Sequence, residues 1–291
     1  MNPFHGSLVA LPTFFRDGEL DLDTLGRAID WHADEQSAGL VVLGTTGEAA
    51  TQSDAERAEV LEFALERAAG RLPVIAGTGS NCTRRTLEHT RAAEAAGADG
   101  ALVVTPYYNR PTQAGLIAHY RAVAEATALP IALYNVPART GCDLLPATVA
   151  AIAAACPNVV AIKEASGSPE RAIELLEEGA LALLIGEDAL LGELARRGAA
   201  GAISVLANVV PASVAELLRE AAPGGNAARA HELEERLAPL TRALFIETNP
   251  APVKAALEML GYGTGEVRLP LVPLSEAGRR HLAAALRDSS N

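Results

Sequence analysis

Short apolar runs recur along the chain at intervals of about 20 to 33 residues, which leaves room for one strand and one helix in each repeat. Most of these runs are apolar at every position, as is typical of parallel strands covered on both faces. There are eight, at residues 7–15, 39–43, 72–77, 101–105, 129–134, 159–163, 181–185 and 201–205. Eight strand–helix repeats predict a (β/α)8 TIM barrel, an architecture of about 250 residues. A doubly wound open sheet is the alternative, because counting repeats does not prove closure.

Helix start signals lie between the runs. Ser53 and Glu56 have the spacing of a capping box, in which each side chain bonds the backbone of the other residue. Ser168, Pro169 and Glu170 supply an N-cap, a proline in the first turn and an acid near the positive end of a helix. These signals place helices after the second and the sixth runs, as a barrel requires.

The pattern changes after residue 224. Later residues contain no strand-like runs and predict helices at 227–244, 252–260 and 275–286. We therefore expect two domains, a catalytic barrel at 1–224 and a C-terminal helical domain at 225–291. The second domain is expected to pack on the barrel or on a neighbouring subunit.

Composition excludes several classes of protein. The 291 residues include 24 basic and 36 acidic side chains, and the resulting formal charge of −12 disfavours nucleic-acid binding. No apolar run approaches the roughly 18 residues of a membrane helix, and the N-terminal sequence lacks the basic region of a secretory signal. Cys82, Cys142 and Cys156 form no CxxC motif, which suits a reducing compartment, so we expect a cytoplasmic location.

Lysine is rare in this chain. Of the 24 basic residues, 22 are arginine, and only Lys163 and Lys254 are lysine. Arginine can replace lysine in most surface ion pairs, but a guanidinium cannot act as an amine nucleophile. Both lysines are therefore candidates for chemistry, with chance retention as the alternative.

The active site of a barrel lies at the C-terminal ends of its strands. Lys163 ends the sixth run after four apolar residues, so its amine is expected in a partly dry barrel mouth, where burial disfavours the charged form. A neutral amine can form an imine, whereas an ion pair with Glu164 or Asp188 is the structural alternative. Tyr134 ends the neighbouring run, where its phenol can transfer protons or merely pack.

Other candidate chemistry gives weaker signals. The Gly-Thr-Thr-Gly turn at residues 44–47 offers N–H groups and hydroxyls that can grip a carboxylate, although such turns often only connect a strand to a helix. Gly77-Thr78-Gly79 lacks the third glycine of a dinucleotide fingerprint. None of the six histidines falls on a predicted strand end, so we expect no metal and no cofactor. Cys142 is interpreted as a small packing residue.

Seven short motifs run through the chain. They are GTTGE (44–48), GTGSN (77–81), TPYYNRP (105–111), LYNVPARTG (133–141), AIKEASG (161–167), GAISV (201–205) and NPAPVK (249–254). Together they resemble the dihydrodipicolinate synthase family of the Schiff-base pyruvate aldolases, a superfamily that also includes N-acetylneuraminate lyase. The resemblance covers nearly the whole chain, and the arginine of PARTG and the paired tyrosines favour the synthase branch.

The resemblance implies a reaction and its catalytic residues. Lys163 would form an imine with pyruvate, and the resulting enamine would attack the aldehyde of L-aspartate 4-semialdehyde. Tyr134 would transfer protons, linked through the Thr45 hydroxyl to Tyr108, which in this family comes from the neighbouring subunit. The product would be 4-hydroxy-tetrahydrodipicolinate, a precursor of diaminopimelate and lysine, formed without a cofactor. Lys254 matches a position where the family usually has lysine, which favours a packing or ion-pair role for it.

The resemblance also implies how the substrates are held and how subunits assemble. Thr46, with Thr45, would hold the pyruvate carboxylate, and the main chain at Gly186 and Ile203 would line the pocket. Arg139 would bind the carboxylate of the semialdehyde, for which a guanidinium fork is well suited. Family members are commonly homotetramers built as dimers of dimers.

One departure from the family concerns regulation. Some members carry a feedback site for lysine at the dimer interface, and Asn81 and Tyr107 match that site. Arg85, however, stands where an acid would hold the effector's ammonium, and Asp54 and Arg57 replace two histidines. A cation facing a cationic ligand is repulsive, so we predict weak or absent inhibition by lysine.

Two alternatives to this function stay open at the level of sequence. Another Schiff-base aldolase or lyase, acting on sialic acid or a keto-deoxy sugar acid, would keep Lys163, Tyr134 and the threonines but would not need Arg139. A non-catalytic barrel that binds a small carboxylate should have lost one of the catalytic residues, and none is lost here.

Overall fold

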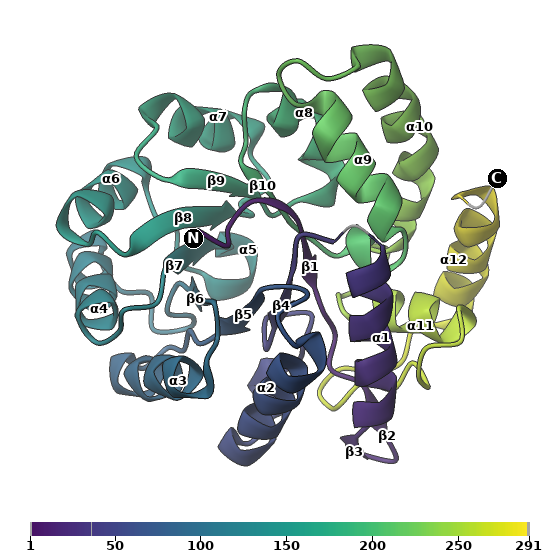
Figure 1. The fold of residues 1–291 in the computed structure, drawn as a ribbon, viewed down its shortest axis with the longest axis horizontal. Helices are drawn as coiled ribbons and strands as arrows, with labels where there is room; N and C mark the ends of the chain where they lie inside the picture. The colour runs from purple at the N-terminus through teal and green to yellow at the C-terminus, as the bar shows by residue number, and fades with distance from the viewer. Residues whose placement is uncertain (1, 36, 290–291) are drawn as a thin grey trace.

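The structure is a computed structural model that describes residues 2–35 and 37–289. Within these residues, eight parallel strands close into a barrel in the order β1-β10-β9-β8-β7-β6-β5-β4, and helices surround it (Figure 1). The closed ring confirms the predicted (β/α)8 TIM barrel and excludes the open sheet. The barrel strands are β1 Gly6–Ala10, β4 Gly39–Val42, β5 Val74–Gly77, β6 Gly100–Val104, β7 Ile131–Asn135, β8 Val159–Glu164, β9 Ala182–Ile185 and β10 Gly201–Ser204.

The first apolar run is the one place where the predicted strand is wrong. The run spans 7–15, but β1 ends at Ala10, and Leu11 makes the last ladder bond to Val41 at 3.0 Å. Pro12 follows without an N–H to donate, so the ladder stops there. The chain then forms a small hairpin of β2 (Phe15–Arg16) and β3 (Glu19–Leu20). The other seven strands agree with the predicted runs to within two residues.

Helices follow the barrel strands as the pattern predicts. The capping box is confirmed, since Ser53 Oγ accepts from Glu56 N at 3.3 Å and Glu56 Oε2 accepts from Ser53 N at 2.8 Å. Ser168 Oγ likewise accepts from Arg171 N at 3.2 Å. The helices around the barrel are α1 Leu22–Asp34, α2 Asp54–Ala68, α3 Thr83–Ala96, α4 Gln113–Glu125, α5 Pro137–Thr140, α6 Pro146–Ala155, α7 Pro169–Glu178, α8 Leu191–Arg196 and α9 Pro211–Ala221.

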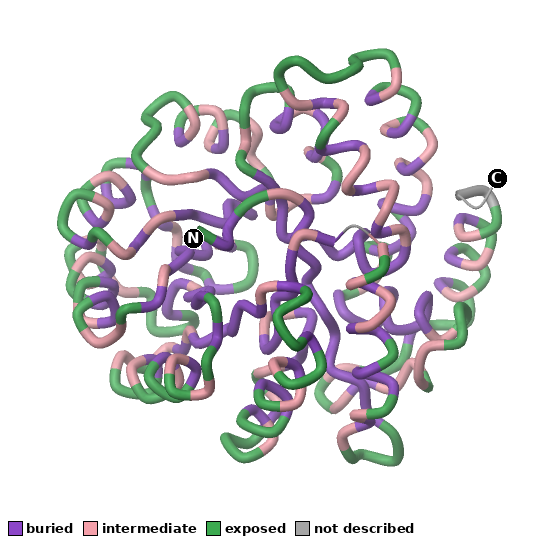
Figure 2. Tube along the Cα trace, viewed as in Figure 1, coloured by how far each residue is buried: buried purple, intermediate pink, exposed green. Residues whose placement is uncertain are grey.

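The hydrophobic core fills the barrel and the layer between strands and helices. Figure 2 shows the strands buried along most of their length, while the outer faces of the helices are exposed. Every residue of β4, β5, β7 and β10 is buried. This explains why the strands read as continuous apolar runs, because neither face of such a strand meets water.

Three further helices follow the barrel, as predicted: α10 (Ala227–Ala243), α11 (Ala251–Met259) and α12 (Glu276–Ser289). Helix α10 packs against α8 and α9, and α12 packs against α10 and α11. The division into domains at 224/225 stays a prediction, and residues 1, 36 and 290–291 of these domains lie outside the described residues. None of the described helices combines the length and apolar character that crossing a membrane requires.

Candidate active site

Two residues of the predicted site lie side by side at the barrel mouth. Tyr134 on β7 is the register partner of Lys163 on β8, so the two side chains project from the same face of the sheet. Lys163 is 7% exposed, and its Nζ lies 4.5 Å from the centre of the Tyr134 ring. A buried ammonium over an aromatic face is attracted to the ring, but the ring does not neutralise its charge.

Two acidic residues near Lys163, Glu164 and Asp188, are bound to other groups. Glu164 accepts from Asn135 Nδ2 at 3.0 Å and from Ser166 N at 2.6 Å. Asp188 accepts from two backbone N–H groups after β10, at 2.8 and 3.0 Å, while burial raises its pKa. Among the described residues, no carboxylate oxygen lies within 4 Å of Lys163 Nζ. The structural alternative, a lysine ion-paired with Glu164 or Asp188, is therefore not found.

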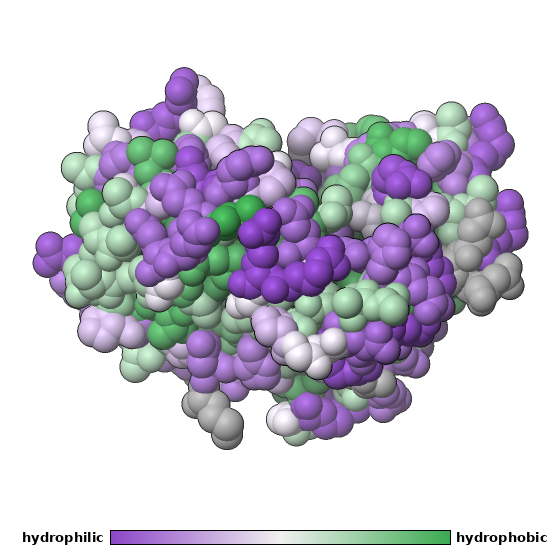
Figure 3. All heavy atoms as spheres, turned by 90° about the horizontal axis from the view of Figure 1, so that it is seen from above, coloured by the Kyte–Doolittle hydropathy of each residue, from purple (hydrophilic) through white to green (hydrophobic). Residues whose placement is uncertain are grey.

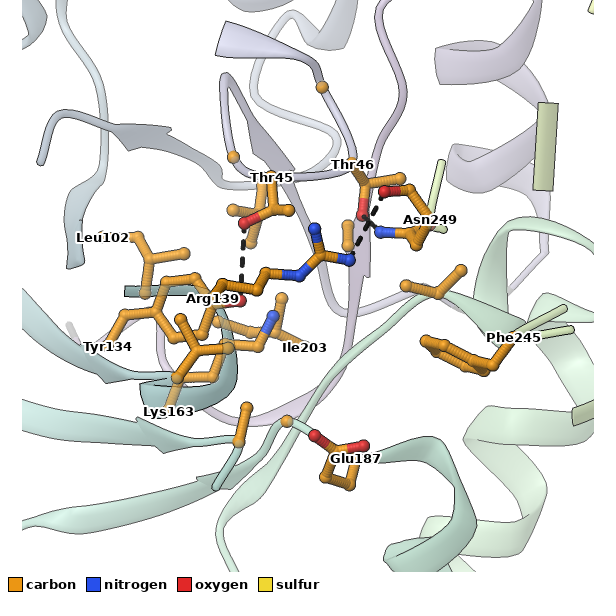
Figure 4. Close-up of a pocket in the computed structure, with 18 residues that line it drawn as sticks. Thr45, Thr46, Leu102, Tyr134, Arg139, Lys163, Glu187, Ile203, Phe245 and Asn249 are labelled. Atoms are coloured by element: carbon orange, nitrogen blue, oxygen red, sulfur yellow. Dashed lines mark hydrogen bonds between the residues drawn. The ribbon is translucent and has the colours of Figure 1, made fainter. Parts of the chain in front are cut away.

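A small cavity of about 60 Å³ opens beside the Lys163 amine (Figure 4). Most of the predicted site residues line it together, although they come from six segments of the barrel. They are Thr45, Thr46, Tyr134, Arg139, Lys163, Gly186 and Ile203. The cavity suits a substrate of a few heavy atoms.

The threonines of the Gly-Thr-Thr-Gly turn take different partners. The Thr45 hydroxyl lies 3.4 Å from the Tyr134 hydroxyl, so a proton can pass between them. The Thr46 hydroxyl accepts from Asn249 Nδ2 at 3.0 Å, and the Asn249 carbonyl accepts from Arg139 Nη2 at 3.4 Å (Figure 4). Thr46 and Arg139 are thus both held by one residue of the C-terminal segment.

Gly186 shows why a glycine is needed at this cavity. A Cβ added there would lie 2.6 Å from Ala165 Cβ and 2.6 Å from the Glu164 carbonyl oxygen. Contacts this short do not occur between real atoms, so any larger residue would push β9 away from β8. Glycine lets the main chain itself form the wall of the cavity.

Three charged, polar or aromatic residues that the sequence did not assign to the site also line the cavity: Glu187, Phe245 and Asn249. Asn249 belongs to the NPAPVK motif, but its distance in sequence from the barrel hid its contact with Thr46. Glu187 lies two residues after the last residue of β9, and this position at a strand end was the available signal. Phe245 follows α10 and has no local pattern that marks it.

Tyr108 is the one predicted catalytic residue that does not line this cavity. Its side chain is exposed (89%), and its φ of +73° lies in the left-handed region, which is uncommon for a residue other than glycine. Cys142, by contrast, is buried in the core as a free thiol, which confirms it as a packing residue.

The second lysine, Lys254, forms a buried ion pair. Its Nζ donates to Glu48 Oε1 at 2.6 Å and lies 4.3 Å from the centre of the Phe15 ring. Burial lowers the pKa of Lys254, and the adjacent Glu48 opposes this. Glu48 also accepts from Arg268 N at 2.9 Å, so one carboxylate ties the turn after β4 to two points of the C-terminal segment. The predicted ion-pair role of Lys254 is confirmed.

A larger cavity of about 440 Å³ extends from the site toward α2 and α3. Arg57, Arg85, Asp54, His89 and Tyr107 line it. Arg57 is buried and donates from Nη2 to a backbone carbonyl at 2.8 Å, and among the described residues it has no carboxylate within 4 Å. His89 Nε2 and Asp54 Oδ1 lie 3.0 Å apart. Glu48 lines this cavity too, but its carboxylate is paired with Lys254.

The fold and the site define a class of protein, a barrel enzyme with a buried amine at the C-terminal ends of its strands. The dihydrodipicolinate synthetase family matches residues 3–289 of the chain. The 4-hydroxy-tetrahydrodipicolinate synthase of Maridesulfovibrio salexigens is 46% identical over 289 residues, 98% of each chain. The crystal structure of the dihydrodipicolinate synthase of Thermotoga maritima has a TM-score of 0.97 at 43% identity, covering 99% of both chains. That of the Acinetobacter baumannii enzyme, complexed with pyruvate, has a TM-score of 0.95 at 43% identity, covering 98% of this chain and 99% of that one. The chain belongs to the dihydrodipicolinate synthetase family.

Proposed function

We propose that this chain is a lyase that condenses pyruvate with L-aspartate 4-semialdehyde through an imine on Lys163, in the diaminopimelate route to lysine. The observation that carries the proposal is the buried Lys163 amine, which has no carboxylate within 4 Å among the described residues and lies 4.5 Å from the Tyr134 ring. An amine without a carboxylate partner, held in a partly dry cavity, is available to attack a carbonyl carbon.

Each side chain at the cavity has its own role in the proposed reaction. Lys163 attacks C2 of pyruvate, water leaves, and Thr45 and Thr46 hold the pyruvate carboxylate. Tyr134 removes a proton from the methyl group to give the enamine, whose carbon attacks the aldehyde carbon, and then protonates the new alkoxide. The amino group of the second substrate attacks C2, and the bond from C2 to Lys163 breaks as the ring closes. Arg139 holds the carboxylate of the semialdehyde.

A coupled assay tests this proposal. Pyruvate and L-aspartate 4-semialdehyde are supplied with dihydrodipicolinate reductase, and the loss of NADPH absorbance is followed. We expect a rate that depends on both substrates and disappears in Lys163→Ala. Absence of a rate in the wild-type chain would refute the proposed reaction, and trapping of pyruvate by borohydride would then show whether the chain is an aldolase for another aldehyde.

We further propose that the working unit contains at least a dimer, with Tyr108 supplied to the site of the neighbouring subunit, and that two dimers form a tetramer. What supports this is an exposed apolar surface, since Tyr107, Tyr108, Leu269 and Val272 are all exposed. Figure 3 shows one face of the molecule, on which apolar side chains gather in patches among hydrophilic ones. The free thiols of the three cysteines support the proposed cytoplasmic location.

Complementation between two inactive variants tests the role of Tyr108. Lys163→Ala and Tyr108→Phe are purified separately, mixed under conditions that exchange subunits, and assayed. If Tyr108 acts across the interface, each mixed dimer holds one intact site and about a quarter of the wild-type activity returns. No recovery, with subunit exchange verified by mass, would place Tyr108 in its own subunit's site or outside catalysis.

We also propose that lysine inhibits this chain weakly or not at all. Arg57 and Arg85 line the larger cavity, and the positive charges of these two guanidinium groups disfavour the ammonium of a lysine molecule. A titration of the coupled assay with lysine tests this, with Arg85→Glu as the variant that should gain sensitivity. Strong inhibition of the wild-type chain by millimolar lysine would overturn the proposal.

A further inference from the structure

Glu187 is the only carboxylate among the described residues that lines the cavity at Lys163. It lies at the end of β9, across the cavity from Thr45, Thr46 and Asn249 (Figure 4). The Glu187 carboxylate makes no capping bond to the short helix that follows it, and no hydrogen bond or ion pair joins this carboxylate to another described residue. A half-buried carboxylate without a protein partner is costly unless something else binds it.

The Glu187 carboxylate does not suit the anionic groups of the substrates. Pyruvate and the semialdehyde each bring a carboxylate into the cavity, and a second negative charge repels both. Burial and the neighbouring Asp188 raise the pKa of Glu187 and so disfavour its negative charge, whereas the positive charges of Lys163 and Arg139 favour it. The two cations are already assigned, because Lys163 forms the imine and Arg139 holds a carboxylate in the proposed reaction.

Only one group of the two substrates is cationic, the α-ammonium of the semialdehyde. It sits on the same carbon as the carboxylate that Arg139 would bind. Arg139 and Glu187 line the same small cavity and are close enough for the charge of one to shift the pKa of the other. A cation and an anion so placed match the two charges of an α-amino acid.

The geometry points to Glu187 as the residue that recognises the ammonium group of the second substrate and so selects an α-amino aldehyde over its deaminated analogue. The inference rests on the proposed function and adds a substrate determinant to it. Glu187 touches the substrate and is a specificity-determining residue; no step of bond formation is assigned to it.

The test compares two aldehydes that differ only in the amino group. L-aspartate 4-semialdehyde is the substrate, and succinic semialdehyde, which has the aldehyde and the carboxylate but no amino group, is used as a competing ligand. KM for the substrate and the inhibition constant of the analogue are measured for the wild type and for Glu187→Gln. Glu193→Gln on α8 is the matched control, since the Glu193 carboxylate makes a surface ion pair with Arg197 and does not line the cavity.

We expect KM for L-aspartate 4-semialdehyde to rise at least about tenfold in Glu187→Gln, because a partly desolvated charge pair is lost. The inhibition constant of succinic semialdehyde stays the same or falls, because the repulsion of its carboxylate is removed. Parallel changes in both constants, or no change in either, would overturn the inference and leave the proposed function intact. A wild-type chain that does not condense L-aspartate 4-semialdehyde with pyruvate would overturn the proposed function, and this inference with it.

Discussion

The two lysines of this chain share an environment and differ in one partner. Both are buried, at 7% exposure for Lys163 and 2% for Lys254, and each places its Nζ over an aromatic ring, at 4.5 and 4.3 Å. Lys254 is 2.6 Å from Glu48, whereas Lys163 has no carboxylate within 4 Å among the described residues. Burial alone therefore does not decide what a lysine does.

The partner decides whether the amine is structural or reactive. At Lys254 the Glu48 carboxylate favours the charged ammonium, and the pair joins the barrel to the C-terminal segment. At Lys163 the carboxylates of Glu164 and Asp188 are engaged by amide and backbone N–H groups. Glu187 lines the same cavity but forms no ion pair with the amine, which is left able to react. A buried ion pair is strongly destabilised when one partner is removed, whereas an amine nucleophile is lost when its nitrogen is replaced. Substitutions at Lys163 and Lys254 separate the reactive role from the structural one.

Replacing each lysine by arginine should give the largest contrast. Lys163→Arg keeps the charge but removes the nucleophile, so kcat should fall by at least about a thousandfold. Lys254→Arg keeps an ion pair with Glu48 and should retain most of the activity. The coupled assay measures both, and a folded Lys163→Arg protein with substantial activity would contradict the assignment.

Removing the charge of Lys254 should cost about 3–5 kcal/mol of unfolding free energy, because Glu48 is left buried without its partner. Urea denaturation of Lys254→Met measures this loss. The double variant Lys254→Met/Glu48→Gln should recover most of it, since the uncompensated charge is gone and the amide can still accept from Arg268 N. A Lys254→Met midpoint equal to that of the wild type would show that the pair is not structural.

Asn249, in the C-terminal segment, contacts Thr46 at the Lys163 cavity. Its replacement should change the kinetics less than the replacement of Lys163 does. In Asn249→Ala the Thr46 hydroxyl loses a donor at 3.0 Å, so KM for pyruvate should rise up to about tenfold with little change in kcat. Asn226→Ala removes the N-cap of α10 and serves as the control, since it costs about 1 kcal/mol of stability without touching the cavity. Equal kinetic effects in both variants would show that Asn249 acts only through stability.

The smallest effect on stability is expected at Glu56. This residue pairs with Arg268, whose backbone N–H donates to Glu48, the partner of Lys254. The side-chain hydrogen bond from Arg268 lowers the pKa of Glu56 to about 2. A lowered pKa in the folded state stabilises the fold above the unfolded value of 4.5, and this contribution is lost as the pH falls from 4.5 toward 2. Glu56→Gln should cost less than about 1 kcal/mol at pH 7, because the pair is partly solvated. Urea midpoints at pH 7 and pH 3 should differ less in the variant than in the wild type.

The barrel and much of the site could be predicted because their signals are local. Strands buried on both faces leave apolar runs, and a polar residue directly after such a run lies at the barrel mouth. Tyr134 and Lys163 end neighbouring strands, so their proximity followed from the fold class. The rarity of lysine in the composition was enough to single out both amines.

The site contacts that could not be predicted join segments that are distant in sequence, and no local pattern encodes such contacts. Asn249 meets Thr46 across 203 positions, and Lys254 meets Glu48 across 206. Glu187 and Asp188 are adjacent acids, yet Asp188 turns to the backbone after β10 while Glu187 lines the cavity. Which of the two faces the substrate is decided by packing, and only the folded chain shows it.

The most direct test of the account is to trap pyruvate on the protein with borohydride and to map the modified lysine by peptide mass spectrometry. With only two lysines in the chain, the result assigns the amine without ambiguity. We predict a pyruvate adduct on Lys163 and none on Lys254, in the wild type and in Lys254→Arg. An adduct on Lys254, or a wild-type chain that traps no pyruvate, would contradict the assignment of Lys163 as the nucleophile.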